Sequence, residues 1–61
     1  MIAVKHEMPK LEEVCEIKLV SGEDHLAMRV EEEGKEYWWN DLHDVIFEDV
    51  EVEAWKYFFP N

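Results

Sequence analysis

The chain has a single cysteine, and that scarcity excludes several kinds of site. With Cys15 alone among 61 residues, one chain can form neither a disulfide nor a cysteine-based zinc or redox site. Long apolar runs are missing as well: residues 1–7 lack the apolar core of a signal peptide, and no stretch approaches the roughly 18 apolar residues of a membrane helix. We therefore expect a cytoplasmic protein that does not bind membranes.

Basic residues are also few, and this sets the sign of the protein's electrostatic field. Six lysines and arginines stand against sixteen aspartates and glutamates, a net charge of −10. Residues 1–30 carry four basic and six acidic side chains, whereas residues 31–61 carry two basic and ten acidic ones. A field of this sign repels nucleic acids and anionic lipids and attracts cationic partners. We expect no direct binding of nucleic acid, and either a partner with a basic surface or a charge that serves solubility alone.

What the chain does have is apolar and aromatic side chains. Hydrophobic residues make up 48% of it and eight residues are aromatic, too many for a disordered acidic tail. We expect a chain this short to be a single small acidic domain, residues 1–61. It lies near the lower limit for folding alone, since it buries only about 60% of the surface that its unfolded form exposes.

Alternating side chains predict a first hairpin. In residues 13–20, Cys15, Ile17 and Leu19 lie on one side of a half-buried strand. The turn chemistry of residues 21–24 follows. Residues 25–31 then alternate again, and this second strand is predicted to carry three apolar side chains on one face: Leu26, Met28 and Val30.

The later segments predict two more strands and one ambiguous stretch. Gly34 suits a turn with positive φ before an aromatic strand at 36–40. Residues 41–47 fit either a short capped helix or a strand, and we favour an irregular or single-turn segment. Residues 50–54 and 55–58 alternate in opposite phase, which predicts a final strand with a bulge near Ala54.

These patterns together predict a mainly β fold. It is a small antiparallel sheet, or meander, of four to five strands, with room for one short helical turn near 41–47. Residues 2–6 can add an edge strand before Pro9, which has no backbone donor to continue a ladder. A helix over 46–58 fits less well, because it would leave Val52, Trp55 and Tyr57 off its apolar face.

Several short pieces of the chain occur in a recognisable order. They are Met8-Pro9, Glu12-Glu13-Val14, Trp38-Trp39, and Val52-Glu53-Ala54-Trp55 ahead of Phe59-Pro60. In this layout the chain resembles a family of short phage and prophage domains of unknown function, which open with Leu-Pro and a Gly-Glu-Glu-Val strand and close on Val-Thr-His-Trp followed by a proline. The similarity covers most of the chain from Met8 onward and departs where His-Trp becomes Ala54-Trp55. It implies a small antiparallel β domain from a phage genome and assigns no catalytic residue.

Candidates for catalysis and metal binding do not combine into a site. Cys15 lies on the apolar side of its strand, which predicts a buried, inert thiol, and Ser21 fits a turn. Three histidines lack the spacing of a metal site: His6, His25 and His43. Residues 41–44 lack the pattern of a calcium loop. We predict no catalytic residue, no metal ligand and no cofactor, and we expect that the protein is not an enzyme.

Adjacent aromatic residues predict an apolar surface. Trp38 and Trp39 are neighbours, so on a strand they point to opposite faces, and so small a sheet has only one fully covered face. One of them is therefore exposed, or covered by another segment of this chain or by a partner. Self-association as a homodimer or higher homo-oligomer would cover it. The aromatic residues predicted to contact a partner are Tyr37, Trp38, Trp39 and Trp55.

The acidic second half favours a binding protein. It can present carboxylates to a basic groove of a host protein, as a nucleic-acid mimic would. With the phage resemblance, this predicts an inhibitor of a host defence or nucleic-acid-processing enzyme, acting in the host cytoplasm. The carboxylates predicted to contact that partner are Glu31, Glu32, Glu33, Glu36, Asp41, Asp44, Glu48, Asp49, Glu51 and Glu53.

Two other functions stay open on the sequence. In the first, an oligomeric sponge stacks the four aromatic residues on a planar small molecule such as a nucleotide, while Lys35, Lys56 or Arg29 supplies positive charge. In the second, the chain is a structural or assembly module of a larger particle.

Overall fold

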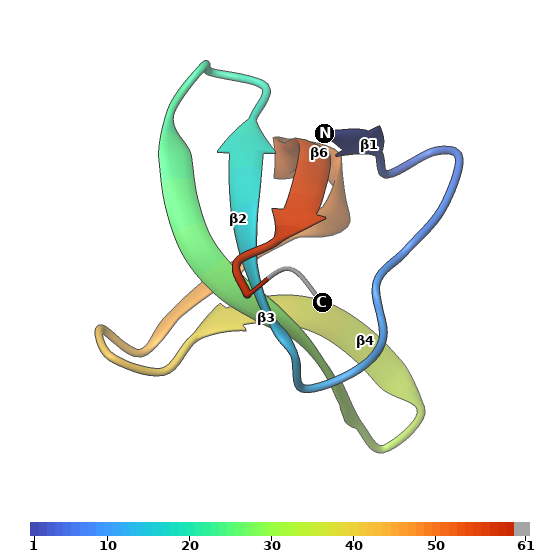
Figure 1. Ribbon diagram of the computed structural model, residues 1–61. Coiled ribbons are helices and arrows are strands. Elements are labelled where there is room, and N and C mark those ends of the chain that lie inside the picture. The colour runs from blue at the N-terminus through green and yellow to red at the C-terminus, as the bar shows by residue number, and fades with distance from the viewer. Residues whose placement is uncertain (60–61) are drawn as a thin grey trace.

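The computed structural model describes residues 1–59, and its strands form one antiparallel sheet (Figure 1). The Pro60 quoted for the family resemblance lies outside the described residues. The sheet order is β1-β6-β2-β3-β4-β5. Its elements are β1 (Ile2–Ala3), β2 (Val14–Leu19), β3 (Asp24–Glu32), β4 (Lys35–Asn40), β5 (Val45–Phe47), a 3-10 turn η1 (Asp49–Glu51) and β6 (Val52–Tyr57). The predicted mainly β class is confirmed, with six strands within residues 1–59 rather than four or five.

The turn between β3 and β4 is the tightest connection in the sheet. Glu32 pairs with Lys35, so only Glu33 and Gly34 form the loop. Both have positive φ, 53° and 81°, as the central residues of a type I′ hairpin require. The prediction of a positive φ at Gly34 is confirmed, and Glu33 shares that conformation although it is not glycine.

The ambiguous segment 41–47 forms no helical turn. Residues 41–44 form a turn in which Asp44 has a φ of 52°, and β5 follows. The short helical turn predicted near 41–47 falls instead at 49–51. There the backbone NH of Glu48 donates to the Glu51 carboxylate at 2.9 Å, so that a first-turn donor is satisfied.

The predicted bulge near Ala54 is confirmed. Lys18 of β2 pairs with Ala54, but the next residue, Leu19, pairs with Val52, so Glu53 is the extra residue on β6. The bulge shifts the alternation of the strand by one position. As a result Val52 and Trp55 both point into the core although they are three residues apart.

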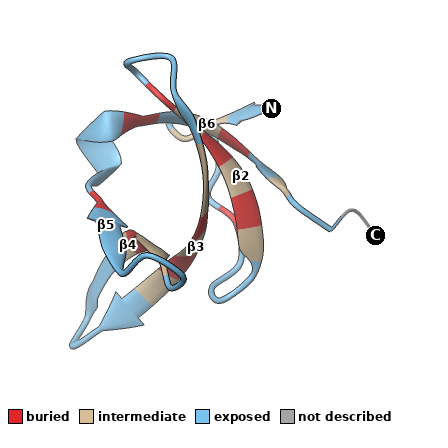
Figure 2. Cartoon of the chain, turned by 90° about the vertical axis from the view of Figure 1, so that its left-hand side faces the viewer, coloured by how far each residue is buried: buried red, intermediate tan, exposed pale blue. Residues whose placement is uncertain are grey.

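The sheet is strongly curved (Figure 2). The rings of His25 on β3 and Phe47 on β5 lie 5.0 Å apart although β4 runs between these strands. The backbone NH of Val20 donates to the Glu51 carbonyl at 2.9 Å, which ties the β2–β3 turn to η1. The concave side of this bent sheet holds the core, formed by Cys15, Ile17, Leu19, Ala27, Trp38, Phe47, Val52 and Trp55.

The core-facing side of β3 is not the side with the large apolar residues. Ala27 and Arg29 are buried, whereas Leu26, Met28 and Val30 share the outer face and are half-buried. These three side chains do face together, as predicted. The registers with the neighbouring strands determine which face of β3 is buried. Ala27 lies opposite the core residue Cys15 of β2, and Arg29 lies opposite the core residue Trp38 of β4. Two indoles fill the small interior, and a short side chain such as that of Ala27 fits beside them.

The N-terminal residues form the predicted edge strand, but a short one. Ile2 pairs with Trp55 and Ala3 with Ala54, and the strand ends there. The chain then passes the β6 indole, whose Nε1–H donates to the Glu7 carbonyl at 2.8 Å. Within residues 1–59 there is no helix with the length and apolarity needed to cross a bilayer.

Candidate interaction surface

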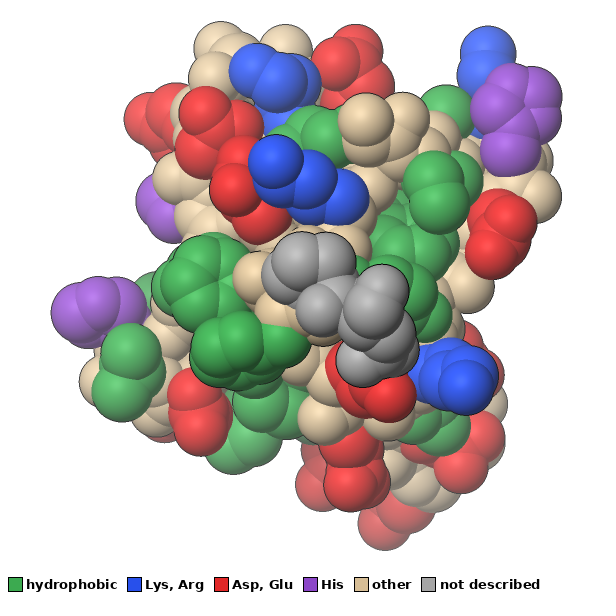
Figure 3. All heavy atoms as spheres, viewed as in Figure 1, with side chains coloured by type: hydrophobic (Ala, Val, Ile, Leu, Met, Phe, Trp, Pro, Cys, Tyr) green, Lys and Arg blue, Asp and Glu red, His purple; other side chains and the backbone are tan. Residues whose placement is uncertain are grey.

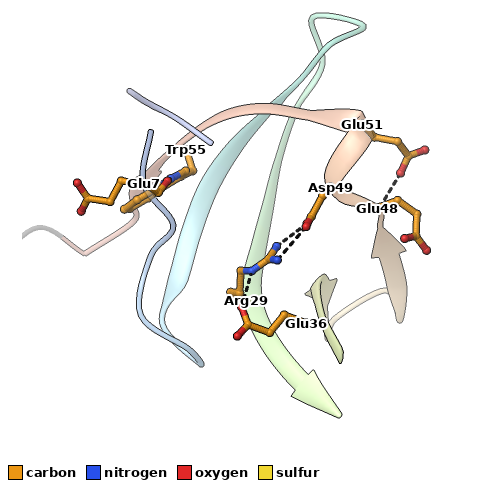
Figure 4. A network of polar contacts seen from close by, with 7 residues as sticks. All are labelled: Glu7, Arg29, Glu36, Glu48, Asp49, Glu51 and Trp55. Atoms are coloured by element: carbon orange, nitrogen blue, oxygen red, sulfur yellow. Dashed lines mark hydrogen bonds and ion pairs between the residues drawn. The ribbon is translucent and has the colours of Figure 1, made fainter. Parts of the chain in front are cut away.

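Arg29 is the buried centre of a charged cluster. Its side chain lies on the concave side of β3, 4% exposed, and its Cζ is 5.2 Å from the centroid of the Trp38 ring. Nη1 and Nη2 donate to the two carboxylate oxygens of Asp49 at 2.5 and 2.9 Å, and Nε donates to Glu36 at 3.1 Å (Figure 4). The guanidinium thereby connects β3, β4 and η1.

The ion pair fixes the charge states of both partners. The hydrogen bonds from Arg29 hold the pKa of the Asp49 carboxyl below its usual range, against the opposing effect of burial. The same bonds raise the pKa of the Arg29 guanidinium. Among the described residues the buried Nε1–H of Trp38 has no hydrogen-bond partner, although it is near enough to Asp49 to add to the lowering of that pKa.

All ten carboxylates predicted to contact a partner are exposed. Arg29 pairs with two of them, Glu36 and Asp49, and none of the other eight takes part in an ion pair among the residues that the structure describes. They lie on the β3–β4 hairpin, in the β4–β5 turn, around η1 and at the β6 bulge. Figure 3 shows acidic side chains at the lower edge of the molecule, over the tip of the β3–β4 hairpin. A fixed scaffold thus presents unneutralised negative charge.

The structure divides the four predicted aromatic residues between the core and the surface. Trp38 and Trp55 are 0% exposed, so the prediction that they contact a partner does not fit the folded chain. Tyr37 and Trp39 are half-buried on the outer face, as the opposite-face argument predicts for one member of the tryptophan pair. The strand register determines which indole is buried. Trp38 lies directly opposite the buried residues Arg29 and Phe47, so its side chain points to the same inner face.

Acidic neighbours hold both surface aromatics. The indole NH of Trp39 donates to Asp44 at 3.1 Å, and the Tyr37 hydroxyl donates to Glu32 at 3.3 Å. Partial desolvation and the charge of Glu32 raise the pKa of Tyr37, so the phenol stays neutral and continues to donate. Both rings are therefore oriented by carboxylates at the surface.

An apolar row crosses the outer face of the sheet beside these rings. Val14 pairs with Met28, Met28 with Trp39, and Trp39 with Ile46. Directly opposite residues in antiparallel strands point to the same face, so these four side chains, here called the outer row, lie side by side. The signal in the sequence was the common face of Leu26, Met28 and Val30. The sequence alone does not predict that this face lies on the outside of the sheet.

The candidate nucleophiles occupy structural positions. Cys15 is fully buried, and desolvation together with the charge of Glu13 raises the pKa of its thiol to about 11, which leaves negligible thiolate at neutral pH. The Ser21 hydroxyl accepts a hydrogen bond from the Glu23 backbone NH at 3.4 Å, as a turn residue does.

Two of the three histidines line the same groove, which their spacing does not suggest. His25 on β3 and His43 in the β4–β5 turn border a groove of about 330 Å³, together with Glu23 and Phe47. His25 Nε2 lies 3.3 Å from a Glu23 carboxylate oxygen. His6 lies in the turn after β1 and is not part of this groove. Over the described range, no group of three or more His, Cys, Asp or Glu side chains could hold a metal ion.

Comparisons with protein-family models, with curated proteins and with solved structures give no match to this chain. The resemblance to short phage domains therefore stays a prediction that depends on the residues quoted for it.

Proposed function

We propose that this protein is a non-catalytic binding protein whose acidic surface occupies a basic surface of a partner protein, in the manner of a nucleic-acid mimic. The partner that best fits this charge is a host defence or nucleic-acid-processing enzyme, which the bound protein inhibits. The observation that carries the proposal is the set of eight exposed carboxylates that form no ion pair within residues 1–59, next to two that are held by Arg29.

The arrangement of these charges suits association with a basic groove. The buried guanidinium joins three elements that carry carboxylates, so the acidic surface is rigid before a partner arrives, and little ordering entropy is lost on binding. Opposite charges speed diffusional encounter, and the association weakens as salt screens them. Nucleic acid itself, which has the same sign of charge, is repelled.

The sponge alternative receives less support from the geometry. It places Tyr37, Trp38, Trp39 and Trp55 on one planar ligand, but two of these indoles fill the core and the other two lie on the outer face. Arg29, one of its suggested cations, is buried and already paired with Asp49 and Glu36. No feature of the structure favours an assembly module over the inhibitor.

The test is capture of host proteins on the immobilised chain at low salt, followed by elution with duplex DNA. We expect DNA-binding proteins to be retained and then released by the competing duplex or by salt. A variant that removes three unpaired charges should lose this capture: Glu31→Gln, Glu33→Gln and Glu53→Gln. A control variant loses the same charge elsewhere and should retain capture: Glu7→Gln, Glu23→Gln and Asp24→Asn. Equal capture by both variants, or capture insensitive to DNA, would show that the proposal is wrong.

A further inference from the structure

We infer that the outer row is the docking site for a basic amphipathic helix of a partner protein. This inference depends on the proposed function, because it specifies which part of the surface makes the contact and what kind of segment it receives.

Within residues 1–59 the outer row is a continuous apolar stripe that the chain leaves partly exposed. Ile46 is 52% exposed, and Phe58 extends the row beyond Val14, since its backbone NH donates to the Val14 carbonyl at 3.0 Å and its side chain is 45% exposed. Five positions across adjacent strands span about 19 Å at the usual strand spacing. Figure 3 shows hydrophobic side chains gathered beside the C-terminal end of β6 on this side of the molecule. A sheet face in contact with water is normally polar, so a stripe of this length indicates an interaction surface.

The centre of the outer row is shaped to receive side chains. A groove of about 90 Å³ lies between Leu26, Met28 and Trp39 on the sheet and Leu42 in the β4–β5 turn. Leu42 is 81% exposed and forms one side of this groove. Because Asp44 holds the Trp39 indole, the largest ring at the site is already in position before binding. Fixed aromatic residues in partly desolvated pockets are the usual anchors of protein interfaces.

The charge around the outer row selects a basic occupant. Three shallow grooves adjoin it, and each contains at least one of its members. Their charged lining consists of five carboxylates and one ammonium group: Glu12, Glu13, Glu32, Asp41, Glu48 and Lys35. A second copy of this chain would bring another net charge of −10 against these carboxylates, which disfavours a homodimer through this face. Lysine or arginine side chains flanking an apolar stripe complement it.

The backbone of the sheet determines the conformation of the occupant. β2, β3 and β4 are paired on both sides and use their NH and CO groups in these ladders, whereas the edge strand β5 leaves free only the groups that point away from β4 in the plane of the sheet. An occupant lying across this face therefore gains no backbone hydrogen bonds from it. It must satisfy its own backbone, which a helix does. A helix of about 13 residues matches the length of the row, with apolar residues at every third or fourth position and basic residues on its flanks.

The test uses a synthetic probe, a 14-residue peptide with leucine on one helical face and lysine elsewhere, titrated into the labelled protein and followed by amide NMR. A peptide of the same composition in scrambled order is the control ligand. We expect the amphipathic peptide to bind and to shift amide signals of the outer row. The variant Ile46→Thr with Leu42→Ser should raise its Kd about tenfold, whereas Val20→Thr with Val50→Ser, at least as exposed but away from the row, should leave Kd within about twofold.

Three results would overturn the inference. Equal affinity of both variants for the peptide would show that charge alone attracts it. Equal affinity for the scrambled peptide would show that no helical face is recognised. A homodimer of the free protein that the Ile46→Thr and Leu42→Ser variant dissociates would make a second copy the occupant. None of these results affects the proposed function, which fails separately if loss of the unpaired carboxylates leaves DNA-sensitive capture intact.

Discussion

The carboxylate of Asp49 in η1 binds the buried guanidinium of Arg29 on β3 in a bidentate pair, at 2.5 and 2.9 Å. This contact crosses the concave side of the sheet and fixes the 3-10 turn that leads from β5 into β6. Arg29 is almost fully buried, whereas the Asp49 side chain is 50% exposed, so the two partners depend on the pair unequally.

Removing Asp49 should destabilise the fold because it leaves a buried cation with Glu36 as its remaining ion-pair partner. We expect Asp49→Ala to lower the free energy of unfolding by about 2 kcal/mol, a drop in Tm of about 10 °C for a domain of this size. Asp41→Ala, at an exposed position outside the ion pairs of the described chain, should change stability by less than about 0.5 kcal/mol. Thermal unfolding followed by circular dichroism measures both, and equal losses would contradict the role assigned to the pair.

The same pair predicts an acid-sensitive contribution to stability. The folded pKa of Asp49 is depressed below the unfolded value of about 3.9, so its contribution is fully present above that value and is lost as pH falls through the folded pKa. We expect the free energy of unfolding of the native protein to fall more between pH 5 and 2 than that of Asp49→Asn. The difference should be roughly 1 kcal/mol or less, because solvent screens the half-exposed carboxylate. Urea unfolding across this pH range, with Asp41→Asn as reference, makes the comparison; parallel curves for the native protein and Asp49→Asn would refute it.

Glu33 is the residue at which the backbone of the β3–β4 turn can be improved. Its φ of 53° is costly for a side chain other than that of glycine or asparagine. Glu33→Asn should therefore raise the free energy of unfolding by about 0.5–1 kcal/mol, because asparagine adopts this conformation more easily. Glu33→Gln removes the same charge without that preference and should give a smaller gain. If the two variants have the same Tm, the gain comes from charge rather than from the turn.

The two core indoles should respond differently to loss of their NH groups. Trp55 donates to the Glu7 carbonyl at 2.8 Å, whereas the buried NH of Trp38 has no hydrogen-bond partner within residues 1–59. Trp55→Phe leaves a backbone carbonyl unsatisfied and should cost about 1 kcal/mol more than Trp38→Phe, which removes an unsatisfied donor. Urea unfolding of the two variants tests this, and a larger loss for Trp38→Phe would mean that its contact with Arg29 outweighs the hydrogen bond of Trp55.

The features that the sequence predicted correctly are local. The change of phase around Ala54 is visible within a few residues, and Gly34 marks its own turn; both are confirmed. The buried face of β3 could not be predicted locally. Its own residues favour burial of the face with Leu26 and Met28, but the registers with β2 and β4 place that face on the outside.

The burial of Arg29 follows from the same registers and could not be foreseen from its neighbours in the chain. The same holds for the groove shared by His25 and His43, which the bend of the sheet and the β4–β5 turn create. All ten carboxylates that the sequence predicted to contact a partner are exposed, but only two of the four aromatic residues predicted with them, Tyr37 and Trp39, lie at the surface. It had no means of telling which tryptophan the core would take.

The pairing of β6 with both β1 and β2 sets an order of events during folding. The β2–β3 and β3–β4 hairpins connect neighbouring segments and can form as soon as those segments exist. The core, however, lacks Val52 and Trp55 until the last strand returns across the sheet to join residues far earlier in the chain. On the ribosome we therefore expect cooperative folding to wait for residues 52–57, with closure of this long-range pairing as the slow step, on the millisecond-to-second scale of non-local β topologies.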